Sequence, residues 1–320
     1  MKKVNVGLMG MGTIGTGSYK IVEMNRKTIE KNTGCDIRFT KILERDTTRD
    51  RGIKVPMELF TQDPEDIYND PDIDIVIEML GSHDPSFMIR CMESGKHVVT
   101  ANKAVIAAHF DELNKVAEEN NVKFMYEASV GGGIPILNAI TTVLGANEFV
   151  EILGILNGTT NYMLTKMTEY GLDYDDVLKD AQEKGFAEPD PTADVEGIDV
   201  ANKVCILMAL GMNHYVHPSE IPTIGITGVT KEAIEEAKAN DCVIKLIGSI
   251  KKDEDGNIEY GVAPRQIPNN HPLAAVSNEF NAIYVTGNAV DELMFYGKGA
   301  GAFPTGSAVI GDVMEIAKQL

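Results

Sequence analysis

The chain has 320 residues, 43% of them hydrophobic and 24% charged, with a net charge of −19. This length and composition are those of a globular protein of about two domains, and the acidic excess argues against nucleic acid or an anionic membrane as a partner. No stretch approaches the roughly 20 apolar residues that cross a bilayer. The four cysteines form no C-x-x-C pair, which indicates thiols in a reducing compartment, so we expect a cytoplasmic protein.

The first predicted elements are a strand and a helix joined by a glycine-rich turn. Residues 4–8 alternate as a strand, and apolar residues recur at helical spacing over residues 14–29. The turn between them reads Gly10, Met11, Gly12, Thr13, Ile14 and Gly15. In a dinucleotide site the first glycine makes the tight turn, the second admits the pyrophosphate and the third lets helix pack on strand. The order of these elements predicts such a site, with phosphates at the helix N-terminus.

The second predicted strand, residues 36–43, ends in Glu44, Arg45 and Asp46. An acid at this place binds a ribose 2′-hydroxyl and favours NAD, whereas an arginine binds a 2′-phosphate and favours NADP. Both side chains could also simply solvate the end of the strand. The residues alone therefore leave NADP and NAD open.

Further strands and helices alternate up to residue 126. Strands are predicted at residues 73–80, 97–100 and 122–126, with helices at 85–94 and 110–120. This alternation is typical of an α/β, Rossmann-type, doubly wound parallel sheet. Ser82 and Lys103 follow two of these strands, at the carboxyl ends where ligands lie in such sheets.

A glycine-rich segment, residues 127–135, ends this domain. Three consecutive glycines, 131–133, would let backbone carbonyls turn toward one point, and with the Glu127 carboxylate they could form an oxygen cage for a hard cation. A hinge between two domains is the simpler interpretation on chemistry alone.

The remaining pattern predicts a second α+β domain built on a mixed sheet, one face of which could contact a second subunit. A helix at 137–144 and a strand at 150–156 precede Asn157-Gly-Thr-Thr-Asn-Tyr162, whose polar residues are good helix N-caps. The later strands are expected at residues 243–251, 258–265, 282–285 and 292–296, the first two joined by a hairpin. His214-x-x-His217 lacks further metal ligands at useful spacing.

The most distinctive stretch is residues 185–208. It contains the acids Glu188, Asp190, Asp194 and Asp199, and then the lysine Lys203. Prolines 189 and 191 make the acidic half extended or turning, and from Ile198 the apolar spacing is helical, which places Asp199 and Lys203 on one face. Carboxylates here could take the ammonium of an amino acid while a lysine does proton chemistry on its oxygen. Most pairs at this spacing, however, are solvated salt bridges of about 0.2–0.5 kcal/mol.

Five blocks of the sequence, in order, resemble homoserine dehydrogenases. They are Arg45-Asp46, residues 127–135, residues 157–162, the string E-P-D-P-x-x-D-x-x-G-x-D-V-A-x-K of residues 188–203, and G-x-G-A-G-x-x-P-T-x-S of residues 297–307, which a helix from about Ser307 follows. The resemblance covers essentially the whole chain and corresponds to a short form without the C-terminal regulatory domain of longer members. It therefore implies little feedback inhibition by threonine through that route.

The resemblance implies a dinucleotide-binding domain of residues 1–130 plus 298–320 and a catalytic and dimerisation domain of residues 131–297, in a homodimer. It implies the reversible reduction of L-aspartate 4-semialdehyde to L-homoserine by NAD(P)H, a step toward threonine and methionine. We expect NADP, with NAD as the other candidate, because the family commonly has Arg-Asp at positions 45–46.

The resemblance also implies roles for individual residues. The catalytic residues would be Lys103, Lys203 and Asp199, and the substrate would be held by Glu188, Asp194, Asp199 and Lys203. The cofactor would contact Gly10, Gly12, Thr13, Ile14, Gly15, Arg45, Ser82, Lys103 and Gly301. A monovalent cation such as sodium would bind the carboxylate of Glu127 and the backbone oxygens of Val130, Gly132 and Ile134.

Two alternatives remain at this point. Another NAD(P)-dependent semialdehyde oxidoreductase, such as aspartate-semialdehyde dehydrogenase, needs an activated cysteine, and no cysteine here stands in a Gly/Ser-rich turn with a suitable histidine. A non-catalytic NAD(P)-sensing regulator would be expected to have a basic patch or to lack the two lysines, and this chain has Lys103, Lys203 and no basic patch.

Overall fold

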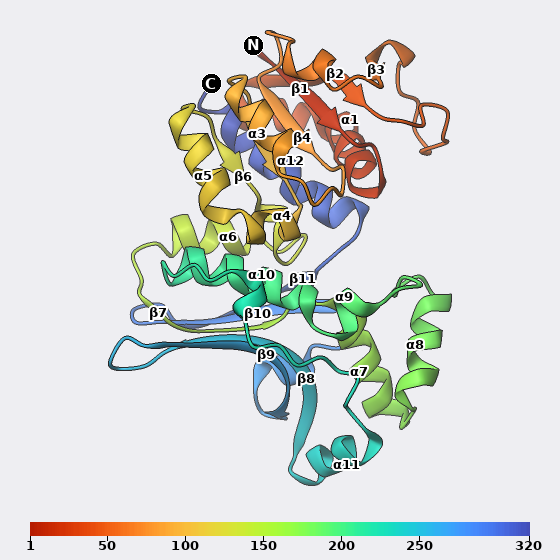
Figure 1. Cartoon of the computed structure of the whole chain (residues 1–320), viewed down its shortest axis with the longest axis vertical. Helices are drawn as coiled ribbons and strands as arrows, with labels where there is room; N and C mark the ends of the chain where they lie inside the picture. The colour runs from red at the N-terminus through yellow and green to blue at the C-terminus, as the bar shows by residue number, and fades with distance from the viewer. The chain divides into compact units, whose positions relative to one another are not determined.

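The computed structural model describes residues 1–320 and divides the chain into two compact units (Figure 1). The first unit comprises Met1–Gly133 and Ala300–Leu320, and the second comprises Ile134–Gly299. Each unit has its own sheet. No helix in either unit combines the length and apolar character needed to span a bilayer.

The first unit is built on a six-stranded parallel sheet with the order β3-β2-β1-β4-β5-β6. Its strands are β1 (Lys2–Met9), β2 (Cys35–Leu43), β3 (Phe60–Thr61), β4 (Ile75–Glu78), β5 (His97–Thr100) and β6 (Phe124–Met125). This is the strand order of doubly wound dinucleotide-binding domains, so the predicted Rossmann-type sheet is confirmed. Strand β3 was not predicted, because two residues are too few to show a period.

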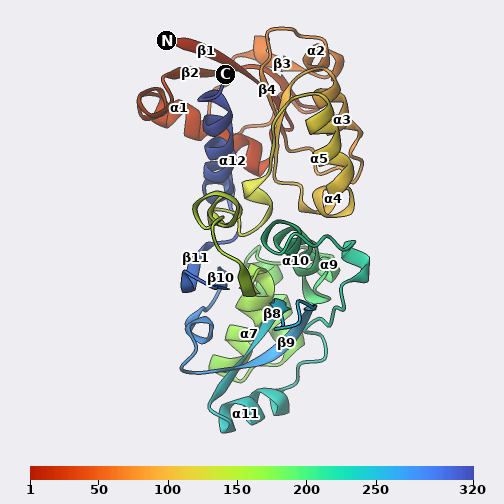
Figure 2. The same cartoon turned by 90° about the vertical axis from the view of Figure 1, so that its left-hand side faces the viewer.

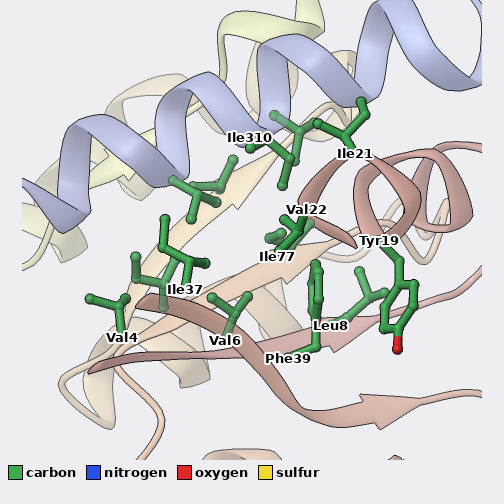
Figure 3. Close-up of a cluster of buried hydrophobic side chains, with 14 of the residues drawn as sticks. Val4, Val6, Leu8, Tyr19, Ile21, Val22, Ile37, Phe39, Ile77 and Ile310 are labelled. Carbon is green, nitrogen blue, oxygen red and sulfur yellow. The ribbon is translucent and has the colours of Figure 1, made fainter. Parts of the chain in front are cut away.

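Helices cover both faces of this sheet (Figure 2). On one face lie α1 (Thr13–Thr33) and α12 (Ala302–Ala317), and on the other α2 (Glu65–Tyr68), α3 (Ser86–Glu93), α4 (Lys103–Ala108) and α5 (Phe110–Glu119). Figure 3 shows how alternate residues Val4 and Val6 of β1 point to the side that Ile310 of α12 covers. The 3-10 helices of this unit are η1 (Met57–Leu59) and η2 (Glu127–Ser129).

The last helix begins five residues earlier than the Ser307 expected from the sequence. Ala302 opens it, and Pro304 lies in its first turn, where a backbone N–H has no partner within the helix. The helix packs closely on α1, because a Cβ added at Gly17 would lie 2.1 Å from the carbonyl oxygen of Ala302. The end of the chain therefore completes the core of the first unit.

The second unit is built on a five-stranded sheet with the order β11-β10-β7-β8-β9. Its strands are β7 (Phe149–Ile155), β8 (Cys242–Lys252), β9 (Ile258–Pro268), β10 (Phe280–Gly287) and β11 (Asp291–Lys298). The α+β class is confirmed, but all the strand pairs are antiparallel where we expected a mixed sheet. Two hairpins, β8–β9 and β10–β11, supply four of the strands, and parallel pairing is limited to one bridge between Thr223 and Val262.

The helices of the second unit are α6 (Ile136–Asn138), the π-helix η3 (Ala139–Val143), α7 (Gly158–Tyr170), α8 (Tyr174–Glu183), α9 (Thr192–Val195), α10 (Ile198–Gly211), α11 (Lys231–Ala239) and the 3-10 helices η4 (Pro218–Glu220) and η5 (Pro272–Ala275). The helix predicted at 137–144 is thus a short α-turn followed by a π-turn.

Helices α10 and α7 pack on opposite faces of β8. Val200 and Val204 of α10 lie over Gly248, where an added Cβ would approach Val204 to 2.6 Å. Lys245 is three residues earlier, so it points to the other face, where its Nζ lies 3.2 Å from Asn161 Oδ1 of α7. The absence of a side chain at Gly248 lets α10 lie directly on the sheet.

Candidate active site

The glycine turn of the first unit has the shape that a pyrophosphate needs. Gly10 has φ +94°, and a Cβ added there would lie 2.5 Å from the carbonyl oxygen of Met79. A Cβ added at Gly15 would lie 2.2 Å from the carbonyl oxygen of Gly10. At Gly12 an added Cβ would meet nothing within 4 Å. Helix α1 begins at Thr13 without a side-chain cap, so its first backbone N–H groups are available to an anion. The residues present therefore fit a dinucleotide.

The acid after β2 stabilises this turn rather than lying open to solvent. Glu44 Oε2 accepts the backbone N–H of Met11 at 2.9 Å and lies 3.3 Å from the Arg51 guanidinium. Burial alone would raise the pKa of Glu44, but hydrogen bonds from the backbone N–H groups of Met11, Asp46 and Arg45 outweigh it and lower that pKa. Arg45, the predicted cofactor contact, is exposed.

A chain of hydrogen bonds joins the carboxyl ends of β4 and β5. The Thr100 hydroxyl donates to Glu78 at 2.7 Å, and the Asn102 amide donates to the carbonyl of Ser82, also at 2.7 Å. Asn102 also caps α4, of which Lys103 is the first residue. Burial raises the pKa of Glu78, which is the last residue of β4. The structure thus places Ser82, on the loop after β4, close to the start of α4, where Lys103 is the first residue.

Gly301 is the N-cap of α12, with φ +123°. Its neighbour Ala302 touches Gly17 of α1, so the tail motif lies next to the helix that begins at the glycine turn. This is the side of the unit where a cofactor contact of Gly301 was predicted.

The segment predicted to hold a cation is buried. Glu127, Val130 and Gly132 all have little exposure, and Gly131 and Gly132 are consecutive left-handed residues with φ of +73° and +57°. The backbone N–H of Glu127 donates to Asp312 Oδ2 at 2.9 Å. Burial, with a smaller contribution from the Glu127 charge, raises the pKa of Asp312 to about 8. Ile134 opens the second unit, and its carbonyl accepts the N–H of Ile136 at 2.9 Å. One carboxylate and several backbone carbonyls in this segment suit a hard cation.

In the second unit, helix α10 presents a buried ion pair. Lys203 Nζ lies 2.7 Å from Asp199 Oδ2 and 2.6 Å from the carbonyl oxygen of Leu156. The two side chains are 9% and 8% exposed. Gly197, in the left-handed region with φ +81°, precedes the helix and lets it start directly after α9. The predicted one-face placement of Asp199 and Lys203 is therefore correct.

A second acid joins this pair through one amide. Asn157 donates to Asp194 Oδ1 at 2.7 Å and to Asp199 Oδ2 at 2.9 Å. Burial raises the pKa of Asp194, and the nearby Asp199 charge adds to the rise, while hydrogen bonds from Asn157 and Thr159 oppose it. The structure thus brings Asp194, Asp199 and Lys203 together.

Glu188 lies apart, on an exposed loop. The loop is tied down by its backbone, since the Thr159 hydroxyl donates to the carbonyl of Phe186 at 2.6 Å and the Gln182 amide donates to that of Glu188 at 3.1 Å. The Glu188 carboxylate is therefore accessible to a ligand, and the backbone of its loop is held in place.

Sequence reasoning treated Asn157 and Thr159 as helix caps and missed their contacts with residues 27 to 42 positions later. The motif of residues 157–162 was the available signal. No local sequence pattern indicated that Glu78 and Asp312 are buried or that Glu44 is half-buried.

Comparison with known proteins agrees with this geometry. Residues 10–127 match the family model for the homoserine dehydrogenase NAD-binding domain and residues 135–314 the model for homoserine dehydrogenase. The homoserine dehydrogenase of Bacillus subtilis is 42% identical over 100% of this chain and 74% of its own length, and that of Synechocystis is 40% identical over 98% and 73%.

Solved structures give the same result. A homoserine dehydrogenase from Thiobacillus denitrificans has a TM-score of 0.95 and 38% identity, covering 99% of this chain and 74% of its own. A hyperthermophilic archaeal homoserine dehydrogenase in complex with NADPH has a TM-score of 0.83 and 26% identity, covering 99% and 98%.

The fold, the glycine turn and these matches define an NAD(P)-dependent oxidoreductase that acts on a CH–OH group of a small molecule. The chain belongs to the homoserine dehydrogenase family. The resemblance drawn from the sequence is thereby confirmed, and so is its preference over a different semialdehyde oxidoreductase or a sensor protein.

Proposed function

We propose that this chain catalyses the reversible, NADP(H)-dependent reduction of L-aspartate 4-semialdehyde to L-homoserine. The observation that carries the proposal is the buried Asp199–Lys203 pair, joined through Asn157 to Asp194. A water-poor site with one lysine and two acids suits a substrate that carries an ammonium and a reactive oxygen.

The nicotinamide cofactor, when bound, supplies the hydride. The protein's part is to orient the substrate and to stabilise and protonate the oxygen on which negative charge develops. We assign the proton transfer to Lys103, at the carboxyl end of β5, and the contact with the reacting oxygen to Lys203.

Glu188 and Asp194 would hold the substrate's ammonium. Asp194 is held by uncharged donors, and Glu188 stands on a fixed loop with its carboxylate in solvent. Ionised carboxylates bind an ammonium by charge-assisted hydrogen bonds. The amino end of the substrate is therefore the part that these two carboxylates recognise.

NADP is the preferred cofactor in this proposal. Glu44, which would otherwise bind a ribose 2′-hydroxyl, is engaged by Met11 and Arg51, whereas Arg45 and Arg49 are exposed near the end of β2. Guanidinium groups pair well with a 2′-phosphate. NAD would bind without this contact and hence more weakly.

A monovalent cation such as sodium would be held by Glu127 and the backbone oxygens of Val130, Gly132 and Ile134. It would offset the negative charge of Glu127, whose backbone N–H contacts the buried carboxyl group of Asp312. We assign it a structural role.

We also propose a homodimer in the cytoplasm, with the first unit as the dinucleotide-binding domain and the second as the catalytic and dimerisation domain. Strand β11 supports a dimer, because it is an edge strand of eight residues with Met294 42% and Tyr296 53% exposed. Exposed apolar edge strands commonly pair with another chain.

Homoserine oxidation, followed by nicotinamide absorbance with NADP and NAD in parallel, tests the proposal. The parent should turn over homoserine with a lower KM for NADP, and Arg45→Ala should raise that KM without changing the KM for NAD. Lys103→Ala should lose nearly all turnover, as removal of a general acid costs about 10²–10⁴-fold. An inactive parent would contradict the function, and near-normal turnover by Lys103→Ala would contradict only its assignment.

Glu127→Ala should show a lower thermal midpoint that no longer depends on sodium or potassium. If it kept the parent's stability and activity in the absence of both ions, the cation site would be wrong.

A further inference from the structure

Asn157 lies between Asp194, assigned to the substrate's ammonium, and Asp199, the partner of Lys203. Its Nδ2 is 2.7 Å from Asp194 Oδ1 and 2.9 Å from Asp199 Oδ2. An amide NH₂ carries two hydrogens, and here each is directed to a different carboxylate. The Oδ1 of the same side chain accepts the backbone N–H of Thr160 at 2.9 Å and its hydroxyl at 3.0 Å.

The charges around this amide explain why an uncharged donor is suitable. The charged groups that face Asp194 are Asp199 and Lys203, both on α10, whereas the α7 groups near it, Asn157 and Thr159, are neutral. Lys203 balances one of the two acids. A second cation at position 157 would cancel the remaining negative charge, which the substrate's ammonium requires, and an apolar residue would leave two neighbouring carboxylates without their donor.

We propose that Asn157 is a positioning residue that holds Asp194 toward the substrate's ammonium and Asp199 against Lys203. The proposal rests on the roles given above to those three residues. It goes beyond the helix-capping role of Asn157, because capping uses only Oδ1 while the two carboxylates use Nδ2. One rigid side chain at the start of α7 thus couples the group that binds the ammonium with the pair that contacts the reacting oxygen.

Asn157→Ser separates the two roles. Serine caps helices about as well as asparagine, but its single hydroxyl cannot donate to both carboxylates. The thermal midpoint should stay near the parent's, while kcat/KM for homoserine falls about 10–100-fold, as is typical when a residue that orients a ligand through a hydrogen bond is removed. Because the lost hydrogen bond lowers the pKa of Asp194, the acid limb of the kcat/KM profile should move to higher pH.

Thr230→Ala is the matched control. Thr230 caps α11 by accepting the N–H of Ala233 at 3.2 Å, and it has no part in the site. This variant should lose stability without any change in kcat/KM or in its pH profile. Its behaviour shows what the loss of a cap does by itself.

If Asn157→Ser does not fold, Asn157→Asp takes its place, since it keeps the shape and the capping oxygen but adds a negative charge. It should move the acid limb further in the same direction. A parental KM and pH profile in either folded variant would overturn the role of Asn157. If the parent oxidises homoserine and Lys203→Ala does not, a parental profile in the Asn157 variants contradicts only the role of Asn157 and leaves the proposed function unchanged. A parent that does not oxidise homoserine contradicts the proposed function itself.

Discussion

Two aspartate–lysine ion pairs of the second unit have the same spacing of four residues, but only one of the two is buried. At the C-terminal end of α8, Lys184 Nζ lies 2.8 Å from the Asp180 carboxylate, with side chains 52% and 36% exposed. In α10, Lys203 Nζ lies 2.7 Å from Asp199, with side chains 9% and 8% exposed. Spacing and distance are nearly the same, so the environment is what distinguishes a solvated pair from a candidate site.

The difference has an energetic meaning. An exposed pair contributes about 0–1 kcal/mol, whereas a buried pair is costly to desolvate and is weak evidence for stability. The α10 pair is compensated by hydrogen bonds from Asn157 to Asp199 and from Lys203 to Leu156. A compensated but costly arrangement of this kind is typical of a functional site.

Burial of a lysine alone does not make such a site. Lys245 of β8 is buried against the segment after η5, where its Nζ lies 2.5 Å from the carbonyl oxygen of Val276. Burial lowers the pKa of Lys245 from 10.5 to about 8. Its nearest partners, Val276 and Asn161, are uncharged, which separates it from Lys203.

The largest expected effect is the difference in coupling energy between the two ion pairs. Double-mutant cycles with Asp→Asn and Lys→Met should give several kcal/mol for Asp199–Lys203, since removing one partner of a buried pair costs about 3–5 kcal/mol. For Asp180–Lys184 the coupling should be below about 1 kcal/mol and should shrink in high salt. Chemical denaturation at two salt concentrations measures both. Equal couplings would remove the physical basis of the distinction.

The second effect is the pH dependence of the free energy of unfolding that Lys245 causes. Between pH 8 and about 10.4 the unfolded chain keeps a proton that the folded chain has lost, so the free energy of unfolding rises with pH across this window. A shift of this size corresponds to something on the order of 3 kcal/mol. The parent should therefore gain stability relative to Lys245→Met between pH 7 and 10.5, as denaturation of both at several pH values would measure. Parallel stability curves would mean that the amine is not held in an apolar environment.

The third effect is on catalysis through Asp199. Asp199→Asn should lower kcat about a hundredfold, because a small misplacement of a reacting group costs about that much. Asp180→Asn should keep the parent's kcat. Initial rates of homoserine oxidation, with thermal unfolding to verify the fold, compare the two. Full kcat in Asp199→Asn would show that Lys203 needs no oriented partner.

Much of this comparison was visible in the sequence, but its decisive part was not. The glycine turn, the alternation of strands and helices in the first unit and the helical spacing of Asp199 and Lys203 are local patterns, and all were predicted. Burial is not local: Asp180–Lys184 has the same spacing as Asp199–Lys203, and only the packing of α10 over Gly248 distinguishes them.

Other features also depended on contacts far apart in the chain. Asn157 reads as a cap until the residues 37 and 42 positions later are placed beside it. The all-antiparallel pairing of the second sheet depends on which strands of two hairpins become neighbours of β7, and the early start of α12 depends on its contact with Gly17. Periodicity carries none of this information.

The most direct test of the central claim is homoserine turnover with NADP by the parent, Lys203→Met and Lys184→Met side by side. If the buried pair takes part in catalysis, Lys203→Met should lose about 10²–10³-fold in kcat, as is typical when a donor to a developing oxyanion is removed, and Lys184→Met should match the parent. A Lys203→Met variant that is folded and retains the parent's kcat would contradict the account, because the lysine would then be no more than a buried structural cation.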